Sequence, residues 1–277
     1  MSLDPGAGEQ TLHSIEGVRF GVFRCPPGDW RWRESNPVGV EHYLVFPHRP
    51  VVIEPEDGQE VIATAAHLVV YDAGGRFRRR QLDPGGDWCT FLAVDPNLMP
   101  GPRTRLGVTP VLTARGFALQ GALFRHLAEA PEPGPLADSA VRALLDVAVA
   151  AEGAAEPDTA RHQRLAWDAA ALLGSAEGSR RPLPELAREL AVSTYHLARI
   201  FRRCTGYSLH DFRRQLRLRA ALAELPDRPR DLAGLAADQG FAHHSHFTKA
   251  FREAFGTVPS HHSREHLPET LWGLIEA

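Results

Sequence analysis

A short repeat in the last third of the chain restricts the fold more than any other feature of the sequence. The pattern Phe-Arg-x-x-x-Gly begins at Phe201 and occurs again from Phe251. Upstream of each copy the sequence predicts a helix, a tight break and a second helix. A small helix residue and a turn residue stand four positions apart in both copies, as Ala187 and Ala191 and then as Ala236 and Gly240. This spacing predicts two helix-turn-helix units in tandem.

Apolar spacing and capping residues set the expected limits of these helices. The predicted helices span residues 183–190, about 194–203, 209–225, 231–239 and about 243–254. Ser193 is the expected N-cap of the second helix, and Gly240-Phe241 forms the second turn. The linker helix 209–225 would be about 26 Å long at ~1.5 Å per residue. That length suits a connection between two helices placed near the ~34 Å spacing of successive major grooves.

The second helix of each unit is the one that would enter the major groove of DNA. Residues at positions i, i+3, i+4 and i+7 share one helix face. The face expected to be buried comprises Leu197, Ile200 and Phe201 in the first copy and Phe247, Ala250 and Phe251 in the second. The opposite stripe comprises Tyr195, Ala198, Arg199 and Arg202, and then Ser245, Thr248, Lys249 and Arg252. Arginine and lysine can donate to guanine O6 and N7 or to phosphates, so double-stranded DNA is the expected partner.

The distribution of charge supports this interpretation. The formal net charge of the whole chain is −3, but residues 180–277 carry +4 and residues 1–179 carry −7. All but one of the basic residues are arginine, and the single lysine, Lys249, falls on the predicted groove face at the position equivalent to Arg199. We therefore expect a basic DNA reader attached to an acidic remainder.

From residue 183 to about residue 264 the chain resembles the AraC/XylS family of bacterial transcription regulators. The resemblance is carried by both turns, by Arg217-Leu218-Arg219-x-Ala221-x-x-x-Leu225, by Ser245-His246-Phe247 and by Phe251-Arg252-x-x-x-Gly256-x-x-Pro259-Ser260. It implies a seven-helix domain with two DNA-reading helices. The base-facing candidates that it implies are Tyr195, His196, Ala198 and Arg199, and then His244, Ser245, His246 and Lys249. Arg202 and Arg252 complete the candidate DNA-binding set.

Two positions depart from the family pattern. His262-Ser263 followed by Arg264 stands where relatives often carry Tyr-Arg after the closing Pro-Ser, so the C-terminal cap is expected to differ. Ala198 stands where relatives often carry a polar reader, and alanine offers contact with a thymine methyl group rather than a hydrogen bond.

The N-terminal region, positions 1–110, has a different composition, with 13 glycines and 12 prolines between short β-favouring segments. These segments, at 18–24, 42–46, 51–54, 67–71 and 88–94, predict an antiparallel β-barrel or jelly roll. Helical patterns follow at 117–129, 136–151 and 159–173. The expected fold is a two-domain α+β protein, a cupin-like β-barrel with packed helices followed by an all-α tandem helix-turn-helix domain. We assign residues 1–110 to the barrel, 111–175 to a helical dimerisation or packing segment, 176–180 to a linker and 181–270 to the DNA-binding domain.

The N-terminal region is also similar to the cupin-type effector domain of many family members. The similarity is carried by Tyr71-Asp72-Ala73-Gly74-Gly75 and Gly86-Asp87-Trp88-Cys89, and it implies a barrel that senses a ligand or a partner. The candidate effector-binding residues are Trp30, Arg31, His42 and Tyr71.

Two charged segments of this region allow alternative interpretations. Trp30-Arg31-Trp32-Arg33 suits a planar or anionic effector, or instead forms a solvated strand at the barrel mouth. The arginines within residues 76–80 are interpreted as a hairpin with solvated charges, with contact to DNA or to an acidic ligand as the alternative.

The alternative function is a metal-dependent cupin enzyme that uses His42, His48 and His67. No His-x-His pair occurs in the N-terminal region, so we expect no metal, no cofactor and no catalytic residue. A zinc site at His243, His244 and His246 or at His261 and His262 is disfavoured against DNA contact, because adjacent histidines on a helix point in different directions. The three cysteines, Cys25, Cys89 and Cys204, are expected to be unpaired thiols in the core or at the surface.

No apolar run approaches the ~18 residues of a membrane span, and the N-terminus lacks the basic and apolar regions of a secretory signal. We therefore expect a cytoplasmic protein that is not an enzyme. Double-stranded DNA is the expected partner. A small-molecule effector, RNA polymerase and a second copy of the chain are further candidates, and no membrane is expected.

Overall fold

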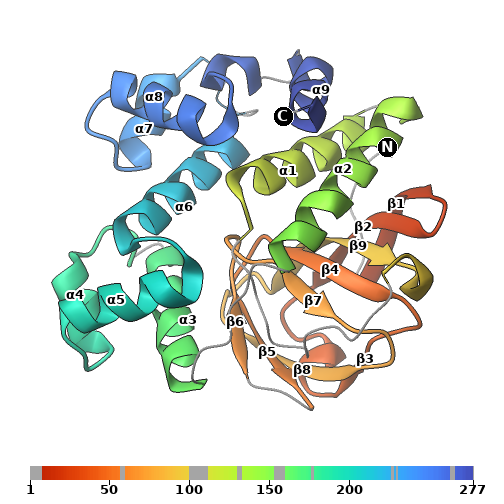
Figure 1. The fold of residues 1–277 in the computed structure, drawn as a ribbon, viewed down its shortest axis with the longest axis horizontal. Helices are drawn as coiled ribbons and strands as arrows, with labels where there is room; N and C mark the ends of the chain where they lie inside the picture. The colour runs from red at the N-terminus through yellow and green to blue at the C-terminus, as the bar shows by residue number, and fades with distance from the viewer. Residues whose placement is uncertain are drawn as a thin grey trace. The chain divides into compact units, whose positions relative to one another are not determined.

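The structure is a computed structural model that describes residues 8–56, 60–99, 112–129, 133–152, 160–175, 178–225, 228, 230–262 and 266–276. Contacts within the chain group it into two compact units. The strand-rich unit comprises residues 2–112 and 148–209, and the helical unit comprises residues 113–147 and 210–277. Figure 1 shows the elements of both units. The domain boundaries expected from the sequence stay a prediction.

Two antiparallel sheets form the body of the strand-rich unit. The five-stranded sheet has the order β1 (Gly8–Ile15), β2 (Val18–Cys25), β9 (Asp87–Val94), β4 (His42–Pro47) and β7 (Val69–Tyr71). The four-stranded sheet has the order β3 (Asn36–Pro37), β8 (Arg76–Gln81), β5 (Val51–Pro55) and β6 (Val61–Ala63). Both sheets contribute to one buried cluster, which includes Val45 and Phe91 from the first and Ile53 and Phe77 from the second. The core therefore lies between the sheets, as in the expected jelly roll.

The strands expected at 18–24, 42–46, 51–54 and 88–94 are confirmed as β2, β4, β5 and β9, and the segment expected at 67–71 is shortened to β7. Two expectations are wrong. Trp30–Trp32 forms a short 3-10 helix, η1, rather than a strand, because the Asp29 carboxylate accepts a hydrogen bond from the Arg31 backbone N–H at 2.9 Å. The arginines of β8 are not all solvated, since strand alternation turns Arg79 into the core with 8% of its surface exposed.

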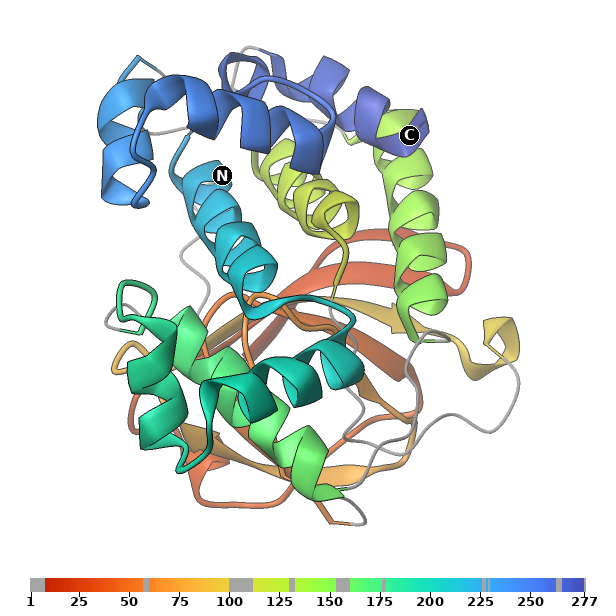
Figure 2. The ribbon, with the colours of Figure 1, turned by 60° about the vertical axis from the view of Figure 1, so that its left-hand side comes forward.

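Helices complete the strand-rich unit. A second 3-10 turn, η2 (Pro96–Leu98), follows β9, and α3 (Ala160–Gly174), α4 (Leu183–Glu189) and α5 (Thr194–Thr205) come later in the chain. Helix α3 packs against both β6 and α5, and Figure 2 shows α3 and α5 side by side in green and teal. Trp167 of α3 packs against the core cluster between the sheets. Arg164 of the same helix forms an ion pair of 2.8 Å with Glu60 beside β6.

The helical unit contains the remaining elements: α1 (Ala114–Glu129), most of α2 (Gly134–Glu152) and α6 (Leu209–Glu224), α7 (Leu232–Asp238), α8 (His244–Phe255), η3 (Pro259–His262) and α9 (Leu267–Glu276). Helix α1 packs on α8 and α9. Arg115 donates hydrogen bonds of 2.9 Å to the last carbonyls of α9, those of Leu274 and Ile275. The helices expected from the sequence are confirmed as α1 to α8, whereas Thr159, the expected start of α3, lies outside the described residues. Within the part of the chain that the structure covers, no helix is long and apolar enough to span a bilayer.

Candidate nucleic-acid interface

The two helix-turn-helix units share one backbone hydrogen-bond pattern. In the first turn the Val192 N–H donates to the Ala187 carbonyl at 3.0 Å, and the Ala191 N–H donates to the Arg188 carbonyl at 3.0 Å. Ala191 has φ of 54°, a left-handed conformation that favours glycine. This combination is a Schellman motif, which ends α4 and redirects the chain toward α5.

The second turn repeats this pattern with glycine in the left-handed position. The Phe241 N–H donates to the Ala236 carbonyl and the Gly240 N–H donates to the Ala237 carbonyl, both at 2.9 Å, and Gly240 has φ of 73°. The connection from this turn to the next helix is longer than in the first unit. Val192 and Ser193 separate the first turn residue from α5, whereas Phe241, Ala242 and His243 separate Gly240 from α8. The second unit therefore holds one additional residue, Ala242, before its second helix.

The repeated Phe-Arg-x-x-x-Gly pattern has a structural role in both copies. The phenylalanines, Phe201 and Phe251, are fully buried anchors of α5 and α8. The glycines, Gly206 and Gly256, end the helices in the left-handed conformation, with φ of 76° and 78°. The arginine of each copy stays exposed. The helix starts differ, because the Ser193 hydroxyl accepts from the His196 N–H at 3.2 Å, whereas the structure gives the N-cap of α8 no side-chain hydrogen bond.

Helix α5 presents a basic surface. Tyr195 is 80% exposed, and Ala198, Arg199 and Arg202 are also exposed, as expected. The sequence of α5 contains no acidic residue. His196 is half-buried at the edge of this surface, where its ring lies 6.2 Å from that of His162 on α3.

Helix α8 presents a more mixed surface. Its exposed residues include the five candidates His244, Ser245, His246, Lys249 and Arg252. Lys249 lies 3.9 Å from the carboxylate of Glu253, which is exposed on the same helix. Thr248, expected on the exposed stripe, is half-buried, and its hydroxyl has no hydrogen-bond partner among the described residues. The structure thus places the two sets of candidates on exposed helix faces, and the face of α5 is the more basic.

His262 corrects one interpretation of the C-terminal histidines. It is 2% exposed, packs edge-on against the Phe251 ring at 5.2 Å, and lies 2.7 Å from the Thr257 hydroxyl through Nε2. Burial lowers the pKa of His262 to about 3, with smaller contributions from Arg125 and His261. His262 is therefore a neutral core residue and not an exposed DNA contact, while Ser263 and Arg264 lie outside the described residues.

The strand-rich unit contains a cavity of about 330 Å³ between its sheets. Three of the four candidate effector residues, Trp30, Arg31 and Tyr71, line it. His42 does not, because alternation along β4 turns Tyr43 into the cavity and His42 away from it. The His42 Nδ1 atom accepts from the Ala73 N–H at 3.2 Å and lies 3.3 Å from the Asp72 carboxylate.

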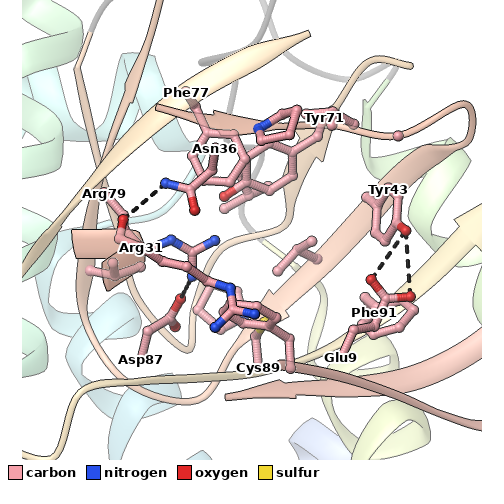
Figure 3. A pocket seen from close by; sticks show the side chains of 18 of the residues that line it. Glu9, Arg31, Asn36, Tyr43, Tyr71, Phe77, Arg79, Asp87, Cys89 and Phe91 are labelled. Carbon is pink, nitrogen blue, oxygen red and sulfur yellow. Dashed lines mark hydrogen bonds and ion pairs between the residues drawn. The ribbon is translucent and has the colours of Figure 1, made fainter. Parts of the chain in front are cut away.

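The sequence interpretation missed a buried ion pair in the cavity wall. The Arg79 Nη1 atom lies 2.8 Å from Asp87 Oδ2 (Figure 3). The same guanidinium group lies over the Phe23 ring, 4.4 Å from its centre. Burial raises the pKa of the Asp87 carboxyl, and the charge of Arg79 opposes this shift. The available signal was the period-2 alternation of β8, which places Phe77 and Arg79 on one face.

The histidines of the enzyme alternative have separate surroundings. The His67 Nδ1 atom accepts from the Thr64 N–H at 3.2 Å, and His48 stacks on Trp88 with ring centres 4.1 Å apart. Among the described residues no group of three or more side chains that could hold a metal ion occurs. Cys25 and Cys89 are buried free thiols, and Cys204 is partly buried.

Comparisons with known proteins match the helix-turn-helix region. A family model for a helix-turn-helix domain matches residues 186–265. The regulatory protein SoxS of Escherichia coli K12 is 30% identical over 99 residues, which cover 36% of this chain and 92% of SoxS. The helix-turn-helix-type transcriptional regulator GlxA of Rhizobium meliloti is 34% identical over 118 residues, which cover 40% of this chain and 36% of GlxA.

A solved structure aligns with more of the chain. ToxT from Vibrio cholerae O395 covers 94% of this chain and all of its own, at 11% identity and a TM-score of 0.35.

Proposed function

This chain belongs to the AraC/XylS family of transcription regulators, and from this premise we propose that its α5 and α8 helices read an operator while the cavity of its strand-rich unit senses a small molecule. The observation that carries the DNA-reading proposal is the pair of matching Schellman turns, each followed by a helix that buries a phenylalanine and exposes basic residues. Such helices lie in the major groove of DNA in helix-turn-helix proteins.

The exposed candidates divide by the chemistry that each can offer. Arg199 and Lys249 stand at equivalent positions near the middle of each face and are proposed to contact bases. An arginine can form a bidentate pair with guanine, whereas a lysine donates from a single point. Arg202 and Arg252 lie one helical turn nearer the C-terminus and are proposed to bind phosphates. Ala198 is proposed to contact a thymine methyl group, and Tyr195, His196, His244, Ser245 and His246 complete the proposed interface.

The sensing role is proposed for the cavity lined by Trp30, Arg31 and Tyr71. Its volume is near the lower end of the ~300–1,000 Å³ that small-molecule sites span. A second copy of the chain and RNA polymerase are proposed as further partners of the regulator. Genome-wide mapping of bound sites would identify the operator and the genes that it controls.

Binding measurements on the mapped operator test the reading surface. We expect Arg199→Ala to weaken operator binding by about 1–3 kcal/mol and to relax specificity at one base pair, because a base contact is lost. Arg202→Ala should weaken binding to all sequences alike and reduce the salt slope by about one, as expected for a phosphate contact. Fluorescence anisotropy against salt concentration measures both effects.

The matched control is Arg78→Ala, which removes an exposed arginine from β8 instead of from a recognition helix. It should leave operator affinity unchanged. Equal operator affinity of the wild-type protein and Arg199→Ala would remove Arg199 from the proposed reading surface.

A further inference from the structure

The walls of the cavity carry charges that cancel. Four charged side chains line it, two of each sign, namely Glu9, Asp87, Arg31 and Arg79. Each has a partner of opposite charge within the protein. Arg79 pairs with Asp87 at 2.8 Å, Arg31 pairs with Asp29 at 3.0 Å, and Glu9 pairs with Arg19 at 3.0 Å. A charged ligand would therefore bring an uncompensated charge next to a wall whose own charges are already paired, at a cost in desolvation.

Aromatic rings come from six of the fifteen uncharged residues that line the cavity. The rings that line the cavity are those of Phe23, Trp30, Tyr43, Tyr71, Phe77 and Phe91. The Arg31 guanidinium group lies 4.9 Å from the Trp30 ring centre. Aromatic pairs contribute about 0.5–1.5 kcal/mol beyond the area that they bury. A flat aromatic ligand is thus favoured over an aliphatic one of equal area.

Two uncharged side chains in this wall, Tyr71 and Asn36, each have a polar atom that makes no hydrogen bond within the described residues, and so do the ion-paired Arg79 and Asp87 through Nε and Oδ1. Tyr71 is 6% exposed and Asn36 is 5% exposed, and the atoms concerned are the Tyr71 hydroxyl and Asn36 Oδ1. The orientation of the Asn36 amide is fixed, because its Nδ2 atom donates to the backbone carbonyls of Arg31 and Glu34 at 3.0 Å.

Phe77 brings the two groups together. Its ring lies 4.6 Å from that of Tyr71, and its backbone pairs with Asn36 in the sheet (Figure 3). Asn36 Oδ1 is an acceptor, and the Tyr71 hydroxyl can donate. Buried polar groups are nearly always hydrogen-bonded, so this pair points to a ligand that offers one donor and one acceptor.

We propose that the cavity binds a small, uncharged aromatic molecule whose polar edge donates a hydrogen bond to Asn36 and accepts one from Tyr71. A carboxamide on a fused ring system has this chemistry, whereas an aromatic carboxylate or amine has the same shape but carries a charge. The inference rests on the proposed sensing function of the strand-rich unit and specifies the ligand class of its cavity.

Three probes of nearly the same shape test the charge requirement on the full chain: indole-3-carboxamide, indole-3-carboxylate and 3-(aminomethyl)indole. At neutral pH the first is uncharged, the second is an anion and the third is a cation. Isothermal titration calorimetry should give a dissociation constant for the carboxamide at least tenfold lower than for either charged probe. Equal or tighter binding of a charged probe would overturn the proposal, and so would failure of all three probes to bind.

Substitutions locate the bound probe. Gly39 lines the cavity, and a Cβ added there meets nothing within 4 Å, so Gly39→Trp places a large ring at the mouth without backbone strain. It should weaken carboxamide binding more than tenfold. The neighbouring Val40 is 85% exposed and does not line this cavity, so Val40→Trp should leave binding unchanged.

Tyr71→Phe keeps the packing on Phe77 and removes only the hydroxyl. It should weaken carboxamide binding by about 2–10-fold, the usual effect of one lost hydrogen bond. Carboxamide binding that is insensitive to Gly39→Trp would place the probe elsewhere and overturn the proposal.

Operator binding measured on the same preparations separates this inference from the proposed function. A charged probe that binds best and alters operator affinity would overturn the ligand class while the regulator proposal stands. A wild-type protein that binds no mapped operator would contradict the regulator proposal, whichever probe it binds.

Discussion

Ala191 adopts a backbone conformation that its residue type disfavours. It is the one non-glycine residue with positive φ in the described part of the chain, and its counterpart in the second turn is Gly240. An alanine in the left-handed conformation costs about 1–2 kcal/mol of folding free energy. Glycine removes this strain, but it loses ~0.4–1 kcal/mol more conformational entropy on folding. We therefore expect Ala191→Gly to stabilise the first helix-turn-helix unit by about 0.5–1 kcal/mol.

The reverse change should have the opposite sign in the second unit. A Cβ at Gly240 would lie 3.3 Å from the Arg217 guanidinium group, so Gly240→Ala should destabilise α7 and α8 by about 1 kcal/mol or more. Hydrogen exchange measured by mass spectrometry resolves the two units separately. Ala198→Gly, the same change at an exposed helical position of α5, is the control and should lower stability. Stabilisation by Ala198→Gly equal to that by Ala191→Gly would refute the strain argument.

His262 makes stability depend on pH. Its ordinary pKa of 6.5 is lowered to about 3 in the folded protein, so the unfolded chain takes up a proton at a pH where the folded chain does not. The contribution to stability is complete above pH 6.5 and is lost as pH falls from 6.5 toward 3. The expected slope approaches about 1.4 kcal/mol per pH unit, the value for one proton taken up on unfolding.

Urea unfolding of the full chain between pH 7.5 and about 5 measures this loss, and His262→Gln should flatten the dependence. An unchanged slope in the variant would assign the loss to other groups. NMR offers a readout that needs no variant, since the His262 ring resonance should show no titration above about pH 4, while a midpoint near 6.5 would contradict the burial argument.

At the scale of elements, the helices proposed to read DNA were predictable because their signals are local. The apolar spacing of Leu197, Ile200 and Phe201 defines one face of α5, so the opposite face follows from helix geometry alone. The strands β2, β4, β5 and β9 were found from apolar runs for the same reason. In contrast, β1 has the polar sequence Gly8–Ile15 and pairs only with β2 at the sheet edge, so no apolar pattern identified it.

The cavity was less predictable because it depends on contacts between distant strands. Arg79 and Asp87 belong to different sheets, and their ion pair exists only once β8 faces β9 across the core. The run of arginines in β8 resembled a solvated segment, and the alternation that buries Arg79 becomes decisive only when Phe77 is placed inside. His42 was wrongly expected in the cavity for a similar reason. It is the neighbour of Tyr43 on β4, and only Tyr43 lines the cavity.

Helix α3 contacts both the core of the strand-rich unit and α5, one of the two helices proposed to read DNA. Its Trp167 packs against the core cluster that includes the cavity residues Tyr71 and Phe77. Nearer its N-terminus, His162 lies beside His196 and 2.7 Å from the Arg203 guanidinium group of α5. Helix α3 thus contacts the core cluster through Trp167 and the edge of the proposed DNA surface through His162.

For the whole molecule, the proposed sensing function requires that the cavity and the DNA surface be thermodynamically linked. If a cavity ligand changes operator affinity by some factor, operator DNA must change the affinity for that ligand by the same factor. Using indole-3-carboxamide as the ligand, we expect equal factors in the two directions, within the ~5–150-fold range of typical couplings. Anisotropy titrations with and without the probe give one factor, and calorimetric titrations with and without operator give the other.

Gly39→Trp and Val40→Trp are the matched pair for this linkage. Gly39→Trp should reduce both factors to one, because the added ring occupies the cavity. Val40→Trp, at the next position in the chain and outside the cavity, should leave both factors unchanged. The two factors must remain equal to each other at every salt concentration, because reciprocity holds under any fixed condition. Salt screening weakens DNA binding both with and without the probe. Two factors of one would show that the cavity does not communicate with the DNA surface. A probe effect on operator affinity that persists in Gly39→Trp would mean that the probe acts from a site outside the cavity.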